Sequence, residues 1–169
     1  MTARILVAGI GNIFLGDDGF GPEVVRRASP AISDGEFGSA TVKLVDYGIR
    51  GMHLAYDLLE DWDALILIDA VPDRGSPGTL RVFETDHETL HATAGLDAHS
   101  MDPGAVFASL QALGGSAPRT IIIGCQAESV DEGIGLTDVV GAAVPEAIAA
   151  IQSVLQMLAS ETCAAVREG

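Results

Sequence analysis

Residues 5–23 read ILVAGIGNIFLGDDGFGPE, and this stretch decides how the chain begins to fold. Residues 5–8 form a short apolar run with β-branched members, which is typical of a strand buried on both faces. Gly9 and Gly11 interrupt that run, and apolar side chains then recur every four positions over 20–28, which predicts a helix with one buried face. A strand, a glycine turn and a helix in this order are typical of the first unit of a doubly wound α/β domain.

The glycines after this strand allow two interpretations. A dinucleotide-binding fingerprint would need a third glycine at the position of Phe14, and the adjacent acids Asp17 and Asp18 would repel a pyrophosphate at the helix start. We therefore favour a tight turn that packs the helix closely on the strand. Acidic residues also stabilise helix N-termini, so we expect one of the two acids to cap the helix and the other to serve a function.

The composition is that of one acidic domain. At 169 residues the chain is long enough for a full hydrophobic core, which we assign to a single domain over 1–159, followed by a disordered tail over 160–169. Nine basic against 24 acidic residues give a net charge of −15. This charge argues against nucleic acid and anionic membranes as partners, because phosphate binding needs clustered Lys and Arg.

Three features favour a cytoplasmic location without membrane insertion. The two cysteines form no Cys-x-x-Cys pair, and Cys125, which ends an apolar run, is expected to be a buried residue in a reducing compartment. The N-terminal residues lead directly into the first strand, so we expect no secretory signal. The longest apolar region, 139–159, contains proline, glutamate and glutamine, and we interpret it as an amphipathic helix rather than a membrane span.

Apolar patterns predict further strands at 41–45, 64–70, 79–83 and 119–125, and further helices at 52–60, 103–113 and 137–158. The run at 64–70 is the most hydrophobic, so we expect it in the centre of the sheet. The loop before 79–83 is too short for a crossover helix, so that strand is expected to run antiparallel at an edge. Residues 29–39 are expected to be a surface connection. The predicted fold class is α/β, a three-layer sandwich with a mostly parallel, twisted five-stranded sheet, one antiparallel edge strand and helices on both faces.

Three residues could form a metal site at one edge of this sheet. Asp18 follows the first strand and Asp69 ends the central one, and the carboxyl ends of parallel strands open the crevice where such folds bind ligands. His99, just ahead of the helix at 103–113, could add an imidazole. Two carboxylates and one imidazole suit a divalent transition metal and leave coordination positions open.

The candidate residues also have simpler structural interpretations. Asp18 could be a helix cap, and histidines in loops are common. Asp69 is the strongest candidate, because an ionised carboxylate at the end of a buried strand is unfavourable unless it is paired. His87 and His91, four residues apart, form an alternative metal pair. Asp46 also ends a strand at the same sheet edge, where a dinucleotide enzyme would use it to hold ribose hydroxyls.

Other catalytic templates fit poorly. The sequence contains no Gly-x-Ser-x-Gly elbow and no Walker A loop, which disfavours an α/β-hydrolase triad and a P-loop. The residues by themselves therefore predict a cytoplasmic α/β domain with a carboxylate–histidine metal site, without identifying a substrate.

From residue 4 to 158 the chain resembles the nickel–iron hydrogenase maturation proteases, the endopeptidases that trim the C-terminal extension of the hydrogenase large-subunit precursor. The motifs that carry this resemblance occur in the family's order and at similar spacing: Gly9-Ile10-Gly11-Asn12, Gly16-Asp17-Asp18-Gly19-Phe20-Gly21, Asp46-Tyr47-Gly48, Asp69-Ala70, His99-Ser100-Met101, Glu128-Ser129 and Gly135-Leu136-Thr137.

The resemblance implies roles for particular residues. Asp18, Asp69 and His99 match the family's metal-contacting triad, and Asp46 matches a further functional acid near the cleft. Some relatives have Glu at the first ligand position, where this chain has the shorter Asp18. Tyr47 replaces one glycine of the family's Asp-Gly-Gly motif.

The resemblance also implies the reaction and its partner. The family recognises nickel already seated in the precursor, so the ion would be carried by the substrate rather than held by the free enzyme. We expect a monomer that acts on the hydrogenase large-subunit precursor. Two alternatives from other classes are a self-contained metallohydrolase with a permanently bound ion and a non-catalytic nickel-delivery module.

Overall fold

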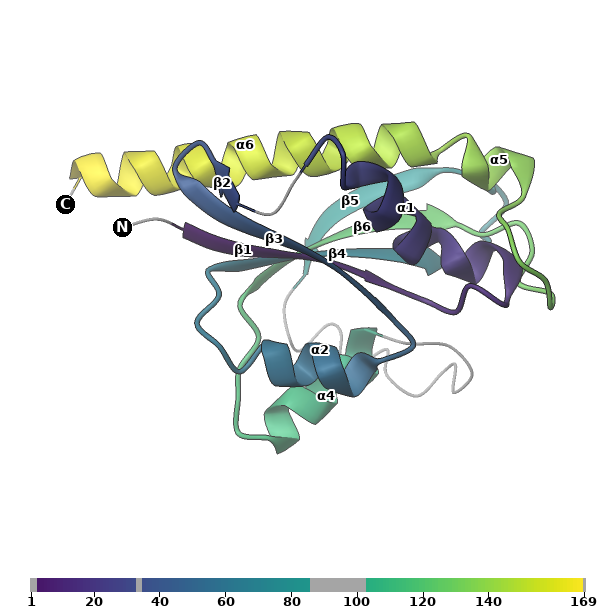
Figure 1. Ribbon diagram of the computed structural model, residues 1–169, viewed down its shortest axis with the longest axis horizontal. Helices are drawn as coiled ribbons and strands as arrows, with labels where there is room; N and C mark the ends of the chain where they lie inside the picture. Colours follow the sequence, from purple (N-terminus) through teal and green to yellow (C-terminus); the bar gives the residue numbers. More distant parts are fainter. Residues whose placement is uncertain (1–2, 33–34, 86–102, 169) are drawn as a thin grey trace.

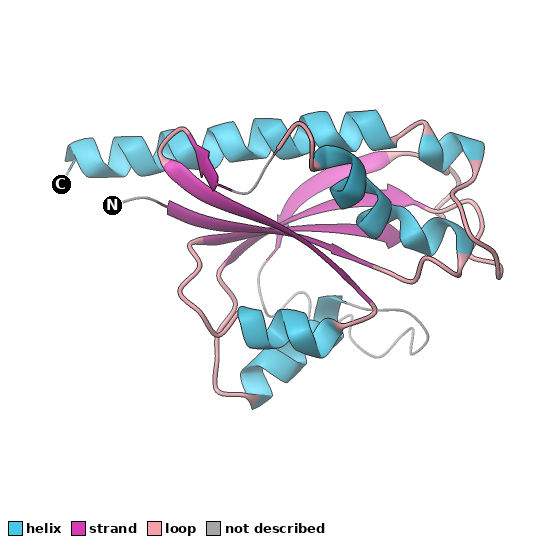
Figure 2. Ribbon diagram, in the orientation of Figure 1, coloured by secondary structure: helices cyan, strands magenta, loops and turns pink. Residues whose placement is uncertain are grey.

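The chain folds around one mixed β-sheet with helices on both faces (Figures 1 and 2). The computed structural model describes residues 3–32, 35–85 and 103–168. The strands are β1 (Ala3–Ile10), β2 (Gly35–Phe37), β3 (Ala40–Gly48), β4 (Ala64–Val71), β5 (Leu80–Thr85) and β6 (Arg119–Gln126). The helices are η1 (Gly16–Gly19), α1 (Phe20–Ala28), α2 (Gly51–Asp57), α4 (Pro103–Ala112), α5 (Asp138–Gly141) and α6 (Val144–Glu168).

The sheet has the order β2-β3-β1-β4-β6-β5, with β1 and β4 at its centre. Strands β3, β1, β4 and β6 are parallel, whereas β5 pairs antiparallel with β6 at one edge. This order confirms the five predicted strands as β1, β3, β4, β5 and β6. It also confirms that the most hydrophobic run lies at the centre and that β5 is an antiparallel edge strand. The side chains from Ala64 to Ile68 are almost fully buried, as expected for a strand covered on both faces.

The sheet also contains a sixth strand that the sequence does not predict. Strand β2 lies in the segment expected to be a surface connection, and it pairs antiparallel with β3 at the other edge. Phe37 pairs with Ala40 across the turn at 38–39, where Gly38 adopts a φ of 59°. A strand of three residues is too short to show an alternating pattern, but Phe37 packs against the core and anchors it.

Each face of the sheet has its own hydrophobic core. Helices α1 and α6 cover one face, where Phe20, Val24 and Ile151 pack against side chains of the central strands. Helices α2 and α4 cover the other, where Leu54 and Phe107 are buried. The side chains of β1, β4 and β6 alternate between these two cores, so the three-layer sandwich is confirmed.

Glycines bring α1 unusually close to the sheet. A Cβ atom at Gly21 would lie 2.4 Å from the carbonyl oxygens of both Ile10 and Ile68, and one at Gly9 would lie 2.5 Å from the carbonyl oxygen of Gly21. Gly11 has a φ of 141°, and a Cβ atom there would lie 1.9 Å from the carbonyl oxygen of Asp18. The glycine motif therefore serves close packing and a tight turn, as the sequence predicts.

Helix α6 differs from the expectation in two ways. The predicted helix over 137–158 is divided into α5 and α6, and Pro145 lies in the first turn of α6, where its missing N–H is tolerated. Helix α6 also continues to Glu168, through the segment expected to be a disordered tail. Residues 138–161 are long and apolar enough to cross a membrane by length and composition, but the inward side chains of this stretch pack in the core beside α1.

The order of the strands creates the predicted crevice. The chain leaves β1 through α1 toward β3 on one side, whereas it leaves β4 toward β5 and β6 on the other side. The direction of winding therefore reverses between β1 and β4, and such a switch point is where doubly wound sheets bind ligands.

Candidate active site

A cleft of about 300 Å³ lies at the carboxyl ends of the central strands. Its walls come from the loops that follow β1, β4 and β6. The lining residues are Leu15, Asp18, Ala70, Val71, Pro72, Asp73, Ala127, Glu128, Ser129 and Val130. The cleft is therefore mostly apolar, with a small number of carboxylates, which is the usual character of a small binding site.

Asp18 is a buried acid in the wall of this cleft. Its side chain is 6% exposed, and its Oδ2 accepts a hydrogen bond of 2.8 Å from the backbone N–H of Asn12. Burial raises the pKa of Asp18, and the hydrogen bond from Asn12 opposes that rise only in part. A carboxylate in this position would gain stability from a nearby cation.

Asp69 lies near the end of β4 and is also 6% exposed. The next two residues of the strand, Ala70 and Val71, line the cleft. Helix η1, which carries Asp18, contacts β4, and Gly9 of β1 pairs with Ile68 of β4. Asp18, on η1 after β1, and Asp69, near the end of β4, therefore lie at the same end of the sheet.

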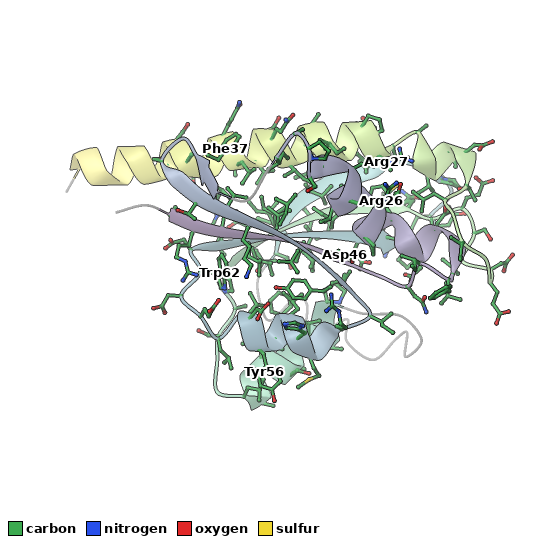
Figure 3. The ribbon with its side chains drawn as sticks, viewed as in Figure 1. Arg26, Arg27, Phe37, Asp46, Tyr56 and Trp62 are labelled. Atoms are coloured by element: carbon green, nitrogen blue, oxygen red, sulfur yellow. The ribbon has the colours of Figure 1, made fainter. Side chains whose placement is uncertain are left out.

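Asp46 lies at the same end of the sheet but farther from the cleft. It pairs with Gly9 across the β3–β1 ladder, and its side chain is exposed (Figure 3). The side chain of Arg50 donates a hydrogen bond of 2.8 Å to the backbone carbonyl of Asp46, not to its carboxylate. The described lining of the cleft does not include Asp46.

The third predicted ligand, His99, lies outside the described residues, as do His87 and His91. Within the described ranges, no group of three His, Cys, Asp or Glu side chains is close enough to hold a metal ion. The structure thus brings two of the three candidate ligands to one end of the sheet.

Asp17 has a role that sequence reasoning missed. Its side chain is fully buried, and it accepts hydrogen bonds from the backbone N–H groups of Glu128 (2.8 Å), Ser129 (3.0 Å) and Thr137 (2.7 Å). The hydroxyl of Thr137 also donates to this carboxylate, at 2.8 Å and 3.0 Å from its two oxygens. Burial opposes ionisation of Asp17, but these hydrogen bonds outweigh it and lower the pKa.

The expectation that one of the two acids caps the helix is therefore wrong. In the part of the chain that the structure describes, neither η1 nor α1 has a side-chain cap, because the chain makes a 3₁₀ turn before α1. From this turn the carboxylate of Asp17 accepts hydrogen bonds from the loop between β6 and α5, more than a hundred residues away in the sequence. No local pattern signals such a contact.

Cys125 is buried in β6, as predicted. Burial raises the pKa of its thiol to about 11, with smaller contributions from the negative charges of Asp17 and Glu146. The thiol is therefore protonated at neutral pH and is not a nucleophile.

Comparisons with known proteins identify the family. A family model described as hydrogenase maturation protease matches residues 23–154. Coenzyme F420 hydrogenase subunit delta from Methanothermobacter thermautotrophicus is 33% identical over 157 residues, which cover 86% of this chain and 90% of that protein. Hydrogenase 2 maturation protease from Escherichia coli is 29% identical, over 90% of this chain and 91% of that protein.

A solved structure agrees with this assignment. The hydrogenase maturating endopeptidase HybD from Escherichia coli superposes with a TM-score of 0.74 at 29% sequence identity, over 91% of this chain and 93% of that chain. The chain therefore belongs to the hydrogenase maturation protease family, whose members are endopeptidases.

Proposed function

We propose that this protein removes the C-terminal extension of a nickel–iron hydrogenase large-subunit precursor after nickel has been inserted. The observation that supports this most directly is the buried carboxylate of Asp18 in the wall of the cleft, with the buried Asp69 at the same end of the sheet, next to the cleft residue Ala70. An endopeptidase of this family needs a site that recognises both a metal and a polypeptide, and such a cleft can hold a short extended segment.

Asp18 and Asp69 contact the precursor's nickel in this proposal, and His99 supplies the third contact. The raised pKa of Asp18 supports this role, because burial has removed the carboxylate from water and, among the described residues, only Asn12 donates to it. A divalent cation brought by the precursor would supply the missing positive charge. Three protein contacts leave positions open for the groups that hold the nickel in the precursor.

The contact with nickel then explains why the enzyme would select nickel-loaded precursor over empty precursor. Once the nickel is in contact with the cleft, the bond to be cut is held near the carboxylates, and an intermolecular reaction becomes effectively intramolecular. An empty precursor lacks this contact and is not positioned. Asp46 is a further acid of the site in this proposal, acting from the end of β3, next to β1.

The reaction takes place in the cytoplasm and involves one enzyme chain and one precursor. The enzyme acts in the manner of an aspartic-type peptidase, in that its functional groups are carboxylates. The net charge of −15 favours a protein partner over nucleic acid.

Mass spectrometry of the precursor tests the proposal. We expect the mass of nickel-loaded precursor to fall by the mass of the extension after incubation with the wild-type protein, and the mass of nickel-free precursor to stay unchanged. Asp69→Asn and His99→Ala should fold normally by circular dichroism and leave the extension uncut. Normal processing by both variants would refute the assignment of these residues.

The same experiment separates the two alternatives. A nickel-delivery module would bind the precursor without shortening it. A self-contained metallohydrolase would retain near-stoichiometric metal in equilibrium dialysis of the free protein, and it would cut nickel-free precursor as well.

A further inference from the structure

Four large apolar side chains are exposed beside the cleft, and we call them the apolar rim: Ile13, Phe14, Val130 and Ile134. Their exposed fractions are 47%, 60%, 54% and 77%. Single exposed apolar residues are ordinary, but a group that borders a binding site indicates a surface that is covered when the partner binds.

The two loops that carry the apolar rim are joined in space although they are distant in the sequence. Leu15 forms a parallel β-bridge with Gly133. The N–H of Gly16 donates to the carbonyl of Gly133, and the N–H of Gly133 donates to the carbonyl of Phe14, both at 2.9 Å. Phe14 and Ile134 therefore project from adjoining stretches of backbone.

The apolar rim is also continuous with the cleft. Val130 belongs to the rim and lines the cleft, and Leu15, which follows Phe14, lines it too. A polypeptide that occupies the cleft therefore contacts Val130 and passes beside the loop that carries Phe14. The rim is therefore in reach of the residues adjoining the bond that is cut.

The backbone beneath the apolar rim is held in place. The side chain of Asn12 accepts a hydrogen bond of 2.9 Å from the N–H of Phe14, and the N–H of Asp17 donates at 2.9 Å to the carbonyl of Ser129. The carboxylate of Asp17 binds the second loop, as described above. A surface that is ordered before binding loses less conformational entropy when a partner covers it.

The loop that carries Val130 and Ile134 is also negatively charged. Glu128, Asp131 and Glu132 are exposed on the same loop, and none of them forms a salt bridge within the described residues. A second copy of this chain, with its own net charge of −15, would meet these acids with like charge. The charges thus favour a partner segment that carries basic residues.

We propose that the apolar rim binds an extended segment of the hydrogenase precursor, next to the bond that is cut, which combines large apolar side chains with basic ones. This inference rests on the proposed function and adds the chemical character of the segment that is recognised. The rim contributes to binding of the precursor and takes no part in bond cleavage.

Binding and cleavage kinetics on nickel-loaded precursor test this proposal. The variant Phe14→Ser/Ile134→Ser should raise both the precursor Kd and the KM about tenfold, which is about 1.4 kcal/mol, and leave kcat within about twofold of wild type. The matched control is Met157→Ser, which removes an apolar side chain that is 41% exposed on α6. We expect this control to leave Kd, KM and kcat unchanged.

A second variant tests the charges without touching an apolar side chain. Asp131→Lys/Glu132→Lys should raise KM and Kd, because the basic residues of the segment would then meet like charge. An unchanged Kd in the Phe14→Ser/Ile134→Ser variant, with its melting temperature intact, would overturn the apolar contact. An unchanged or lower Kd after the charge reversal would overturn the basic character of the segment.

Two further results distinguish this inference from its alternatives. Wild-type protein that binds precursor through the rim but leaves it uncut would refute the proposed function and support the docking surface. A concentration-dependent dimer in sedimentation velocity that disappears in the Phe14→Ser/Ile134→Ser variant would show a second copy as the occupant and overturn the proposal.

Discussion

Replacing Asp17 by asparagine tests how the wall of the cleft is held. The carboxylate accepts hydrogen bonds on both oxygens, from Glu128 and Ser129 on one and from the N–H of Thr137 on the other. An amide has one accepting oxygen, so the asparagine side chain must turn its NH₂ group toward at least one of these N–H donors. The best orientation gives up the Thr137 N–H and keeps the other two.

The magnitude follows from these contacts. One buried donor without a partner costs about 1–3 kcal/mol, and each remaining bond weakens by about 1 kcal/mol when the charge is lost. Since water can reach part of the loop, we expect Asp17→Asn to lower the free energy of unfolding by about 3 kcal/mol. For a chain of this size, that corresponds to a fall in Tm of about 6–12 °C.

Urea unfolding at pH 7 measures this effect, and hydrogen exchange locates it. The midpoint should fall with an unchanged m value, and the amides of Glu128, Ser129 and Thr137 should lose protection. Thr137→Val, which removes only the hydroxyl donor, should be destabilised by about 1–2 kcal/mol, whereas Thr137→Ser should be close to wild type. An Asp17→Asn variant within about 0.5 kcal/mol of wild type, the usual range for a neutral surface change, would refute the claim that an ionised Asp17 holds the loop.

The pH dependence provides an independent check on Asp17. Its pKa is lower in the folded than in the unfolded chain, so the unfolded state binds the proton more readily. The stabilisation is therefore fully present above the unfolded pKa of about 4 and is lost as the pH falls through the folded value. In the Asp17→Asn variant this loss of stability with falling pH should be absent, so its free energy of unfolding should change less than that of wild type below about pH 4.

Three other substitutions have distinct expected outcomes. Asp18→Asn should abolish cleavage, yet the variant should unfold at the same or a slightly higher urea concentration than wild type at pH 7. The reason is that burial raises the pKa of Asp18, and the amide oxygen of asparagine can still accept the hydrogen bond from the N–H of Asn12. A marked loss of stability would contradict this. In thermal unfolding, Gly21→Ala should destabilise the fold by about 3 kcal/mol or more, because the new Cβ would lie 2.4 Å from two backbone oxygens. The control Gly141→Ala, whose new Cβ would have no heavy atom within 4 Å, should be neutral or stabilising. Tyr47→Phe removes a hydrogen bond of 2.6 Å to Asp57 and should lower the free energy of unfolding by about 1–2 kcal/mol, a loss that the exposed control Tyr56→Phe should not show.

Much of the fold could be predicted because local sequence and tertiary structure agree. The apolar run at 64–70 is buried on both faces as β4, and the short loop before 79–83 forces the antiparallel direction of β5. Strand β2 escaped prediction because its stability comes from pairing with β3 and from Phe37. The helical state of 160–168 escaped it because helix continuation depends on the preceding turns of α6 rather than on a pattern of its own.

The position of Asp18 and Asp69 at one end of the sheet could be predicted from the strand ends, whereas the long-range contacts beside them could not. Asp18 and Asp69 follow from the rule that carboxyl ends of neighbouring parallel strands share one edge. The role of Asp17 does not follow from any spacing, because its partners lie more than a hundred residues away. The apolar rim depends on the same contact between loops, which no local periodicity encodes.

The two adjacent acids of η1 differ in the number of hydrogen-bond donors that face them. Asp17 and Asp18 are neighbours in the chain and both are buried, yet the pKa of the first is lowered and that of the second is raised. The difference lies in the donors that the described residues provide: three backbone N–H groups and a hydroxyl face Asp17, while one N–H faces Asp18. The charge of Asp17 is therefore already compensated by the protein, whereas we propose that the charge of Asp18 is compensated by the cation of the precursor. A carboxylate that the fold leaves short of positive partners is the one suited to contact a substrate metal, so the adjacent Asp17 can hold the cleft in shape without competing for the ion.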